Sequence, residues 1–166
     1  MNTNTLSHNY YAHSENNAGK KQTLKEHGIG VGKLMREFAL AESFADLYEY
    51  CGTIHDMGKY SSAFQRHISG ENNRVRHSIY GAMFAKEKSL MEIAFPVFGH
   101  HAGLPDNPEM RKIIMAEINT HDSTYNDILA NWEKDSPGAV FIPEDKAFRN
   151  LSDILLQELF VRMLYS

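Results

Sequence analysis

Apolar residues recur at intervals of three and four positions through almost all of the 166-residue chain. This spacing places them on one face of an α-helix, and no stretch of useful length alternates as a half-buried strand does. Three of the expected helices begin after the N-caps Ser43, Ser61 and Asn107, and another begins near Leu24. The others are expected to cover Val75–Met83, Ile93–Phe98, Ser123–Glu133, and Glu144 to the end. The sequence therefore predicts an all-α helical bundle.

Length and composition favour one soluble domain covering residues 1–166. Hydrophobic residues make up 42% of the chain, which is enough for a core. No apolar run reaches the roughly 18 residues of a membrane helix, and the polar N-terminal residues do not resemble a signal peptide. A single cysteine, Cys51, allows no internal disulfide. We therefore expect a cytoplasmic protein without membrane contact.

The net charge of −4 argues against a protein that coats nucleic acid by bulk electrostatics. Small groups of basic residues occur at Lys20-Lys21, Arg74 with Arg76, Lys86 with Lys88, and Arg111-Lys112. As isolated groups they are predicted to be solvated, and a pair of bound divalent cations would outweigh any of them. Affinity for phosphate must therefore be local.

The doublet His55-Asp56 stands near the end of an expected helix. A carboxylate has two oxygens, so Asp56 can bridge two cations about 4 Å apart and offset their repulsion. Metal-binding histidines must be neutral and oriented, which favours burial on helix faces. Helical periodicity places both His55 and His27 on inward faces. Asp56 is therefore the expected centre of a metal site.

The remaining histidines complete two predicted ligand sets. The first set is His27, His55 and Asp56, and the second set is Asp56, His77, His100 and His101. Nitrogen-rich ligation favours manganese, iron, cobalt or nickel, with zinc or magnesium as further possibilities, and we expect one or two ions per chain.

Two such ions predict a metal-dependent phosphodiesterase. They would bind a phosphodiester oxygen, lower the pKa of a bound water to near neutral and stabilise the leaving oxygen. Lys59, one helical turn beyond His55, would add positive charge against the transition state. Asp56 and Lys59 are therefore the predicted catalytic residues.

Five ordered motifs resemble those of one known family. They are Tyr11-Ala-His-Ser14, Leu24-Lys-Glu-His27, Gly52-Thr-Ile-His-Asp-Met-Gly-Lys-Tyr-Ser61 followed by Phe64-Gln65, Arg76-His-Ser78, and Gly99-His-His-Ala-Gly103. Together they look like the HD nuclease domain of the CRISPR-associated helicase-nuclease of type I systems. The resemblance implies an HD-superfamily bundle that nicks and degrades single-stranded DNA with divalent transition metals in antiviral defence. It also implies two partners, a superfamily 2 helicase and a target-bound CRISPR surveillance complex.

The chain departs from the family pattern at its end. The family completes its first metal site with a late aspartate, a few residues after a stretch matching Arg162 to Ser166, where this sequence stops. The last expected helix also lacks a C-terminal glycine, basic turn or polar tail. We therefore expect a domain truncated at its C-terminus, with weaker metal binding in the first site or one ion in the second site only.

Two alternative functions stay open. One is a nucleotide phosphohydrolase of the wider HD superfamily, which uses the same metal chemistry but usually needs only one metal site. The other is a non-catalytic metal-binding module that docks to a helicase or surveillance complex. The second-site histidines His77, His100 and His101 favour the nuclease.

Other motifs carry weaker signals. The doublet His121-Asp122 lacks a following Gly-Lys and is predicted to cap a helix or lie on the surface, and His67 is predicted to be exposed. The run Gly28–Lys33 is not a phosphate loop, because that pattern needs glycine at position 27 and serine or threonine at position 34. Its glycines predict close packing of this helix on a neighbour, although each costs roughly 1 kcal/mol of helix propensity.

Overall fold

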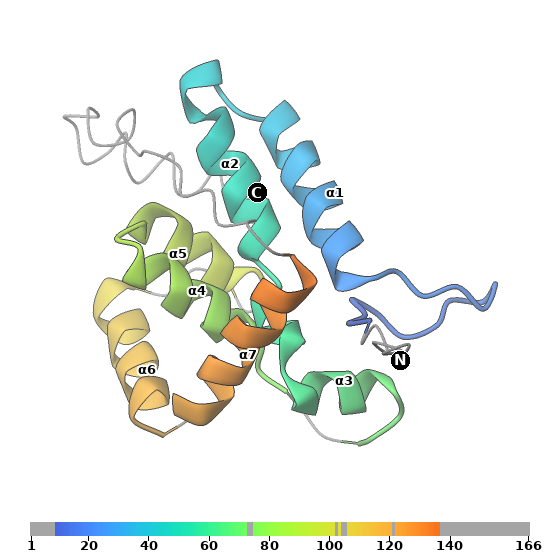
Figure 1. The fold of residues 1–166 in the computed structure, drawn as a ribbon. Coiled ribbons are helices and arrows are strands. Elements are labelled where there is room, and N and C mark those ends of the chain that lie inside the picture. Colours follow the sequence, from blue (N-terminus) through green and yellow to red (C-terminus); the bar gives the residue numbers. More distant parts are fainter. Residues whose placement is uncertain (1–8, 73–74, 102, 104–105, 121, 137–166) are drawn as a thin grey trace, which may run out of the picture.

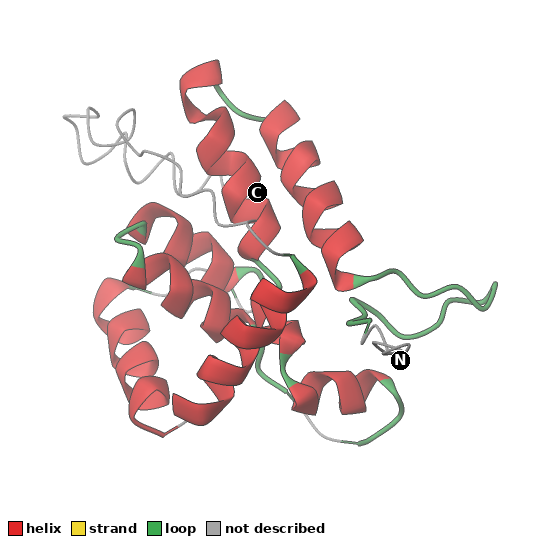
Figure 2. Cartoon of the chain, viewed as in Figure 1, coloured by secondary structure: helices red, strands yellow, loops and turns green. Residues whose placement is uncertain are grey.

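The computed structural model describes residues 9–72, 75–101, 103, 106–120 and 122–136, and every regular element within them is helical (Figures 1 and 2). The helices are α1 (Leu24–Glu37), α2 (Glu42–Ile54), the 3₁₀ helix η1 (Met57–Tyr60), α3 (Ser62–Ile68), α4 (Ser78–Glu87), α5 (Met91–Gly99), α6 (Asn107–Thr120) and α7 (Asp122–Asp135). The prediction of an all-α fold is confirmed. No helix in these ranges has both the length and the apolar character needed to cross a membrane.

Helices α1 and α2 lie side by side because glycine removes the side chains between them (Figure 1). A β-carbon on Gly32 would lie 2.8 Å from the carbonyl oxygen of Glu49, and one on Gly52 would lie 2.9 Å from the α-carbon of Gly32. Neither position accepts a side chain without moving a backbone. The predicted close packing of this glycine-containing helix is therefore confirmed.

The start of α1 is fixed by a reciprocal capping box. The Thr23 hydroxyl accepts a hydrogen bond from the Glu26 amide at 3.2 Å, and the Glu26 carboxylate accepts one from the Thr23 amide at 3.2 Å. Such caps satisfy backbone donors that a helix leaves unpaired. His27 directly follows this box, so the cap also fixes the position of His27.

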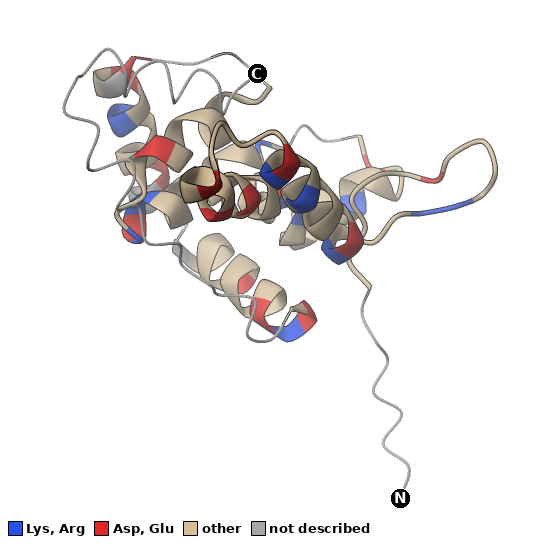
Figure 3. Cartoon of the chain, turned by 90° about the horizontal axis from the view of Figure 1, so that it is seen from above, with Lys and Arg blue, Asp and Glu red and all other residues tan. Residues whose placement is uncertain are grey.

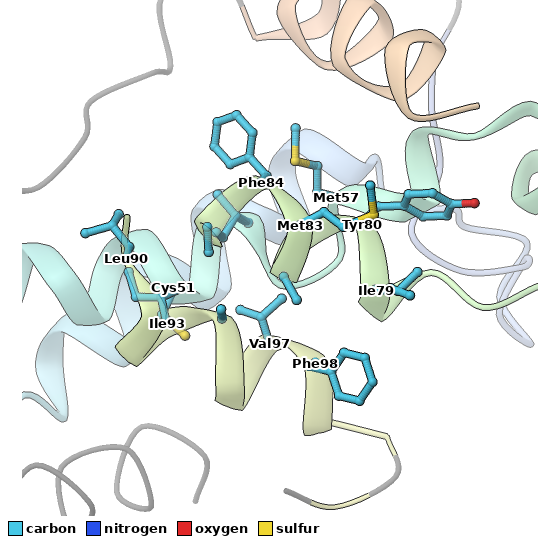
Figure 4. Packing of buried hydrophobic residues seen from close by; sticks show 14 of the residues in the cluster. Cys51, Met57, Ile79, Tyr80, Met83, Phe84, Leu90, Ile93, Val97 and Phe98 are labelled. Atoms are coloured by element: carbon cyan, nitrogen blue, oxygen red, sulfur yellow. The ribbon is translucent and has the colours of Figure 1, made fainter. Parts of the chain in front are cut away.

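The core lies between α2, α4 and α5, and α6 and α7 add to it (Figure 4). Its fully buried side chains include Ile54 from α2, Ile79 from α4, and Ile93 from α5. Burial of each such side chain contributes roughly 1.5–3 kcal/mol. This apolar centre holds the ends of α2, α4 and α5 at fixed positions.

Helix α7 fastens η1 to the rest of the bundle. The Asn131 side chain donates to the Tyr60 carbonyl at 3.0 Å, and the Tyr60 hydroxyl donates to Asp135 at 2.8 Å. Between Asn131 and Asp135, Trp132 packs edge-on against Phe84 of α4, with ring centroids 5.0 Å apart. The segment that carries Lys59 is therefore joined to α7, which itself packs on α4.

Several predicted details were wrong. Helix α2 begins at Glu42 after the N-cap Ala41 rather than after Ser43, and the side chain that caps α6 is Asp106 rather than Asn107. The apolar spacing that follows Leu24 predicts inward positions for Leu34 and Phe38, but they are 50% and 71% exposed, because glycines form much of the face of α1 that meets α2.

The position of Gly58 after the His55-Asp56 doublet predicts a left-handed residue that ends a helix, and this prediction is wrong. Positive φ angles occur at other described glycines, and Gly58 lies inside η1. Its lack of a side chain matters for packing, because a β-carbon there would overlap the carbonyl group of His77.

His67 is exposed, as predicted, whereas His121 and the expected C-terminal helix fall outside the described residues.

Candidate metal centre

Asp56 lies at the junction of α2 and η1, and its side chain is buried among imidazoles. Its Oδ2 atom lies 3.1 Å from Nε2 of His27 and 3.1 Å from Nε2 of His55. Its Oδ1 atom lies 3.2 Å from Nε2 of His77 and 3.5 Å from Nε2 of His100. Each carboxylate oxygen therefore faces its own pair of histidines.

Four separate elements bring these side chains together. His27 comes from the first turn of α1, and His55 is the residue that ends α2. His77 precedes α4, and His100 ends α5. The glycine packing between α1 and α2, together with the shared apolar core, therefore sets the geometry around Asp56.

Two imidazoles are oriented by backbone carbonyls. Nδ1 of His55 lies 2.7 Å from the Gly52 carbonyl oxygen, and Nδ1 of His100 lies 2.7 Å from the Val97 carbonyl oxygen. A carbonyl only accepts hydrogen bonds, so Nδ1 carries the proton in each ring. In a neutral ring the lone pair is then on Nε2, which faces Asp56. Backbone contacts of this kind commonly orient histidine ligands in metal sites.

A cation bound between Asp56 and the histidines would satisfy buried polar atoms that otherwise have no hydrogen-bond partner among the described residues. Within the described residues, Oδ1 of Asp56 and Nε2 of His100 are buried and have no hydrogen-bond partner, despite lying 3.5 Å apart. Leaving such an atom unsatisfied costs about 1–3 kcal/mol. Protonating every imidazole around Asp56 would instead place like charges against one another. A divalent metal bound by both atoms satisfies them, so the residues present fit a metal.

His101 extends the second set of ligands. Its Nε2 atom lies 2.8 Å from Nε2 of His77, and its ring centroid lies 4.0 Å from that of His100. His101 is exposed, but partial desolvation of its ring, together with His100 and His77, lowers its pKa to about 4. The imidazole is therefore neutral at neutral pH, which is the form that binds a metal.

The ionisation of Asp56 also suits a ligand. Burial alone raises the pKa of this carboxyl. In the metal-free protein, an imidazole of His100, His27, His55 or His77 that carries a proton on Nε2 stabilises the anion, and together these contacts hold the pKa of Asp56 well below its usual range. Asp56 is therefore an anion at neutral pH.

The structure groups the predicted ligands as the sequence analysis did. Among the described residues, potential ligand atoms lie within 4.8 Å of one another in two sets: His27, His55 and Asp56; and Asp56, His77, His100 and His101. Asp56 is shared by both sets. The binding of metal by these residues stays a prediction.

Lys59 is buried on the Oδ2 side of Asp56. Its ammonium group lies 2.8 Å from Oδ2 and donates to the Ala12 carbonyl at 3.2 Å. The amine is therefore engaged by Asp56 and by the N-terminal segment. Lys59 positions both of these groups around the candidate centre.

Sequence reasoning missed two contributors to the site. The imidazole of His13 lies edge-on to His27, with ring centroids 5.0 Å apart. The side chain of Gln65 donates to the carbonyls of Tyr11 at 3.0 Å and Lys59 at 2.8 Å, and it accepts from the Tyr11 amide at 3.0 Å. Both residues fall within the recognised motifs, but only the structure shows what they contact.

The comparisons with known proteins agree with this geometry. The family model described as "Cas3, HD domain" matches residues 2–139. No curated protein matches the chain significantly. The matched family implies a metal-dependent nuclease role in CRISPR systems, acting on DNA, with a helicase as the partner in Cas3. Since the match covers most of the sequence, the chain belongs to the Cas3 HD domain family.

Proposed function

We propose that this protein hydrolyses phosphodiester bonds of single-stranded DNA during CRISPR interference, using one or two divalent transition metals held around Asp56. The division of histidines between the two oxygens of Asp56 carries this proposal. A bridging carboxylate needs one oxygen directed at each metal site, and membership in the Cas3 HD domain family supports the same chemistry.

The proposed ligands divide as the two sets do. His27, His55 and Asp56 would hold one ion, and Asp56, His77, His100 and His101 would hold the other. Manganese, iron, cobalt and nickel suit these nitrogen donors better than magnesium, which prefers oxygen, and zinc also suits them. A bound ion would supply Lewis acidity to the phosphodiester and a water of lowered pKa.

The chain's own residues prepare the site for that chemistry. The carbonyls of Gly52 and Val97 orient His55 and His100, so neither ring has to turn when a metal binds. Asp56 is ionised before binding. The fixed Lys59 ammonium group balances part of the negative charge at Asp56 Oδ2. These features lower the cost of organising the site.

Family membership also suggests the setting of the reaction. We propose a cytoplasmic nuclease that works beside a superfamily 2 helicase at a CRISPR surveillance complex. The helicase would supply single-stranded DNA to the metal centre.

The test is to incubate the purified protein with circular single-stranded DNA and manganese, cobalt or nickel. We expect linear DNA and then short fragments, and we expect Asp56→Asn to abolish both. A nucleoside triphosphate and a cyclic dinucleotide are offered in parallel. Hydrolysis of either nucleotide with intact DNA would favour a nucleotide phosphohydrolase and contradict the proposal. Metal binding without any hydrolysis would favour a docking module.

A further inference from the structure

Residues 13–22, which we call the arm, form an exposed loop that projects from the body ahead of α1 (Figure 1). Every residue of the arm is exposed, so none of them contributes to the core. The two ends of the arm meet, because the Ala12 amide donates to the Gln22 carbonyl at 3.0 Å and Tyr11 pairs with Thr23 in an isolated β-bridge. The arm therefore leaves and rejoins the body at one point.

The base of the arm is fastened to the candidate centre. Lys59 bonds both the Ala12 carbonyl and Oδ2 of Asp56, so one ammonium group links the arm to the bridging carboxylate. Gln65 holds Tyr11 through both its amide and its carbonyl. The first arm residue, His13, lies edge-on to His27. The arm thus begins at the edge of the centre and extends outward.

The tip of the arm has a defined conformation. The Asn16 side chain accepts hydrogen bonds from the amides of Ala18 and Lys20, each at 3.0 Å, and the Asn16 amide donates to the Lys20 carbonyl at 3.0 Å. Gly19 completes the turn with a φ of 70°, which favours glycine. Since the turn is already ordered, a ligand that binds here has little backbone to immobilise.

Lys20 and Lys21 carry two adjacent ammonium groups, and that of Lys21 lies over the Tyr11 ring at the base of the arm, 5.3 Å from the ring centroid. Within the described residues neither forms an ion pair, whereas Arg36 and Arg66 both pair with carboxylates. The arm carries one acidic residue, Glu15. Figure 3 shows the basic residues on this projecting loop. In a chain of net charge −4, phosphate affinity has to be local, and the arm carries two ammonium groups on a loop whose base contacts the candidate centre.

We propose that the arm binds the phosphates of single-stranded DNA next to the bond that is cut, through Lys20 and Lys21. This inference rests on the proposed function, since it needs a scissile phosphate at the metal centre. A bound strand continues beyond that phosphate, and the lysines of the arm lie on a loop that begins at the edge of the metal centre. Contacts of this kind position a strand without reading its sequence. Lys20 and Lys21 are exposed, as the sequence predicted, and the proposal gives this solvated group a role in binding.

The test measures the binding of a labelled phosphorothioate thymidine 30-mer, which resists hydrolysis, by fluorescence anisotropy with manganese over a range of salt concentrations. The variant is Lys20→Gln/Lys21→Gln. The matched control is Lys86→Gln/Lys88→Gln, which changes two lysines at the end of α4 far from His77. For the arm variant, we expect several-fold weaker binding at low salt. Its log–log salt slope should be smaller by about 1.4, from two contacts of about 0.7 each.

Equal slopes for the arm variant and the wild type would overturn the proposal, and so would an equal loss in the control pair. Hydrolysis of bis(p-nitrophenyl) phosphate, a phosphodiester without flanking phosphates, separates the arm from the centre. The arm variant should lose several-fold more kcat/KM on thymidine DNA than on this small substrate, and equal losses would contradict the proposal. If the wild type hydrolyses neither substrate, the proposed function fails, while the anisotropy result still decides whether the arm binds DNA.

Discussion

Gly58 packs so closely against His77 that a β-carbon on residue 58 would overlap the His77 carbonyl group. Gly58 lies in η1, two residues after Asp56, and His77 immediately precedes α4. The absence of a side chain at position 58 thus allows the start of α4 to approach Asp56. A glycine two residues after Asp56 therefore allows His77, a ligand of the second set, to lie close to Asp56.

Gly58→Ala should displace His77 from Asp56. We expect weaker metal binding by the second set and a loss of about 1–3 kcal/mol in unfolding free energy, the usual cost of overpacking. Manganese titration and thermal unfolding measure the two effects. Gly30→Ala is the matched control, because a β-carbon there meets nothing within 4 Å and should raise helix propensity. Unchanged manganese affinity in Gly58→Ala would contradict this role for the glycine.

Lys59→Met should destabilise the metal-free protein more than the metal-loaded protein. The substitution removes the buried ammonium group from Asp56 and from Ala12, and removing one partner of a buried ion pair costs about 3–5 kcal/mol. A bound cation compensates part of the lost charge at Asp56. Urea unfolding with manganese and with a chelator measures the difference. Equal destabilisation in both conditions would show that Lys59 acts independently of the metal centre.

The hydroxyl groups of two buried tyrosines should differ in their effect on stability. Tyr60 donates to Asp135 at 2.8 Å, so Tyr60→Phe should lower the unfolding free energy by about 1.5–3 kcal/mol, the range for a hydrogen bond to a charged group. Tyr50→Phe is the control, because its buried hydroxyl has no hydrogen-bond partner among the described residues, and it should be neutral or stabilising. Chemical denaturation measures both. Equal losses would argue against the link between α7 and η1.

Metal should leave the centre as the pH falls. Protons and metal compete for the same imidazole nitrogens, so the metal-free state binds more protons and gains population at low pH. Asp56 and His101 keep their ligand forms, since the pKa values of both are lowered, that of His101 to about 4. Manganese content after dialysis should fall between about pH 7.5 and about pH 5. A constant content over this range would argue against histidine ligation.

The sequence was sufficient to predict the helical fold and the grouping of candidate ligands. Apolar spacing identifies inward helix faces, which placed His27 and His55 near Asp56. The sequence did not predict the exposure of Phe38 or the contact between Gly58 and His77, because each depends on the distance between two helices. The same holds for His13, since an exposed loop residue carries no periodic signal.

Asp56→Ala, combined with elemental analysis, tests the central claim most directly. The wild-type protein, Asp56→Ala and the exposed-site control His67→Ala are dialysed against manganese and freed of excess metal. If Asp56 joins the two sets of histidines, the wild type and His67→Ala carry the same one or two ions per chain, and Asp56→Ala carries none. Wild-type metal content in Asp56→Ala would contradict the bridging role of this carboxylate.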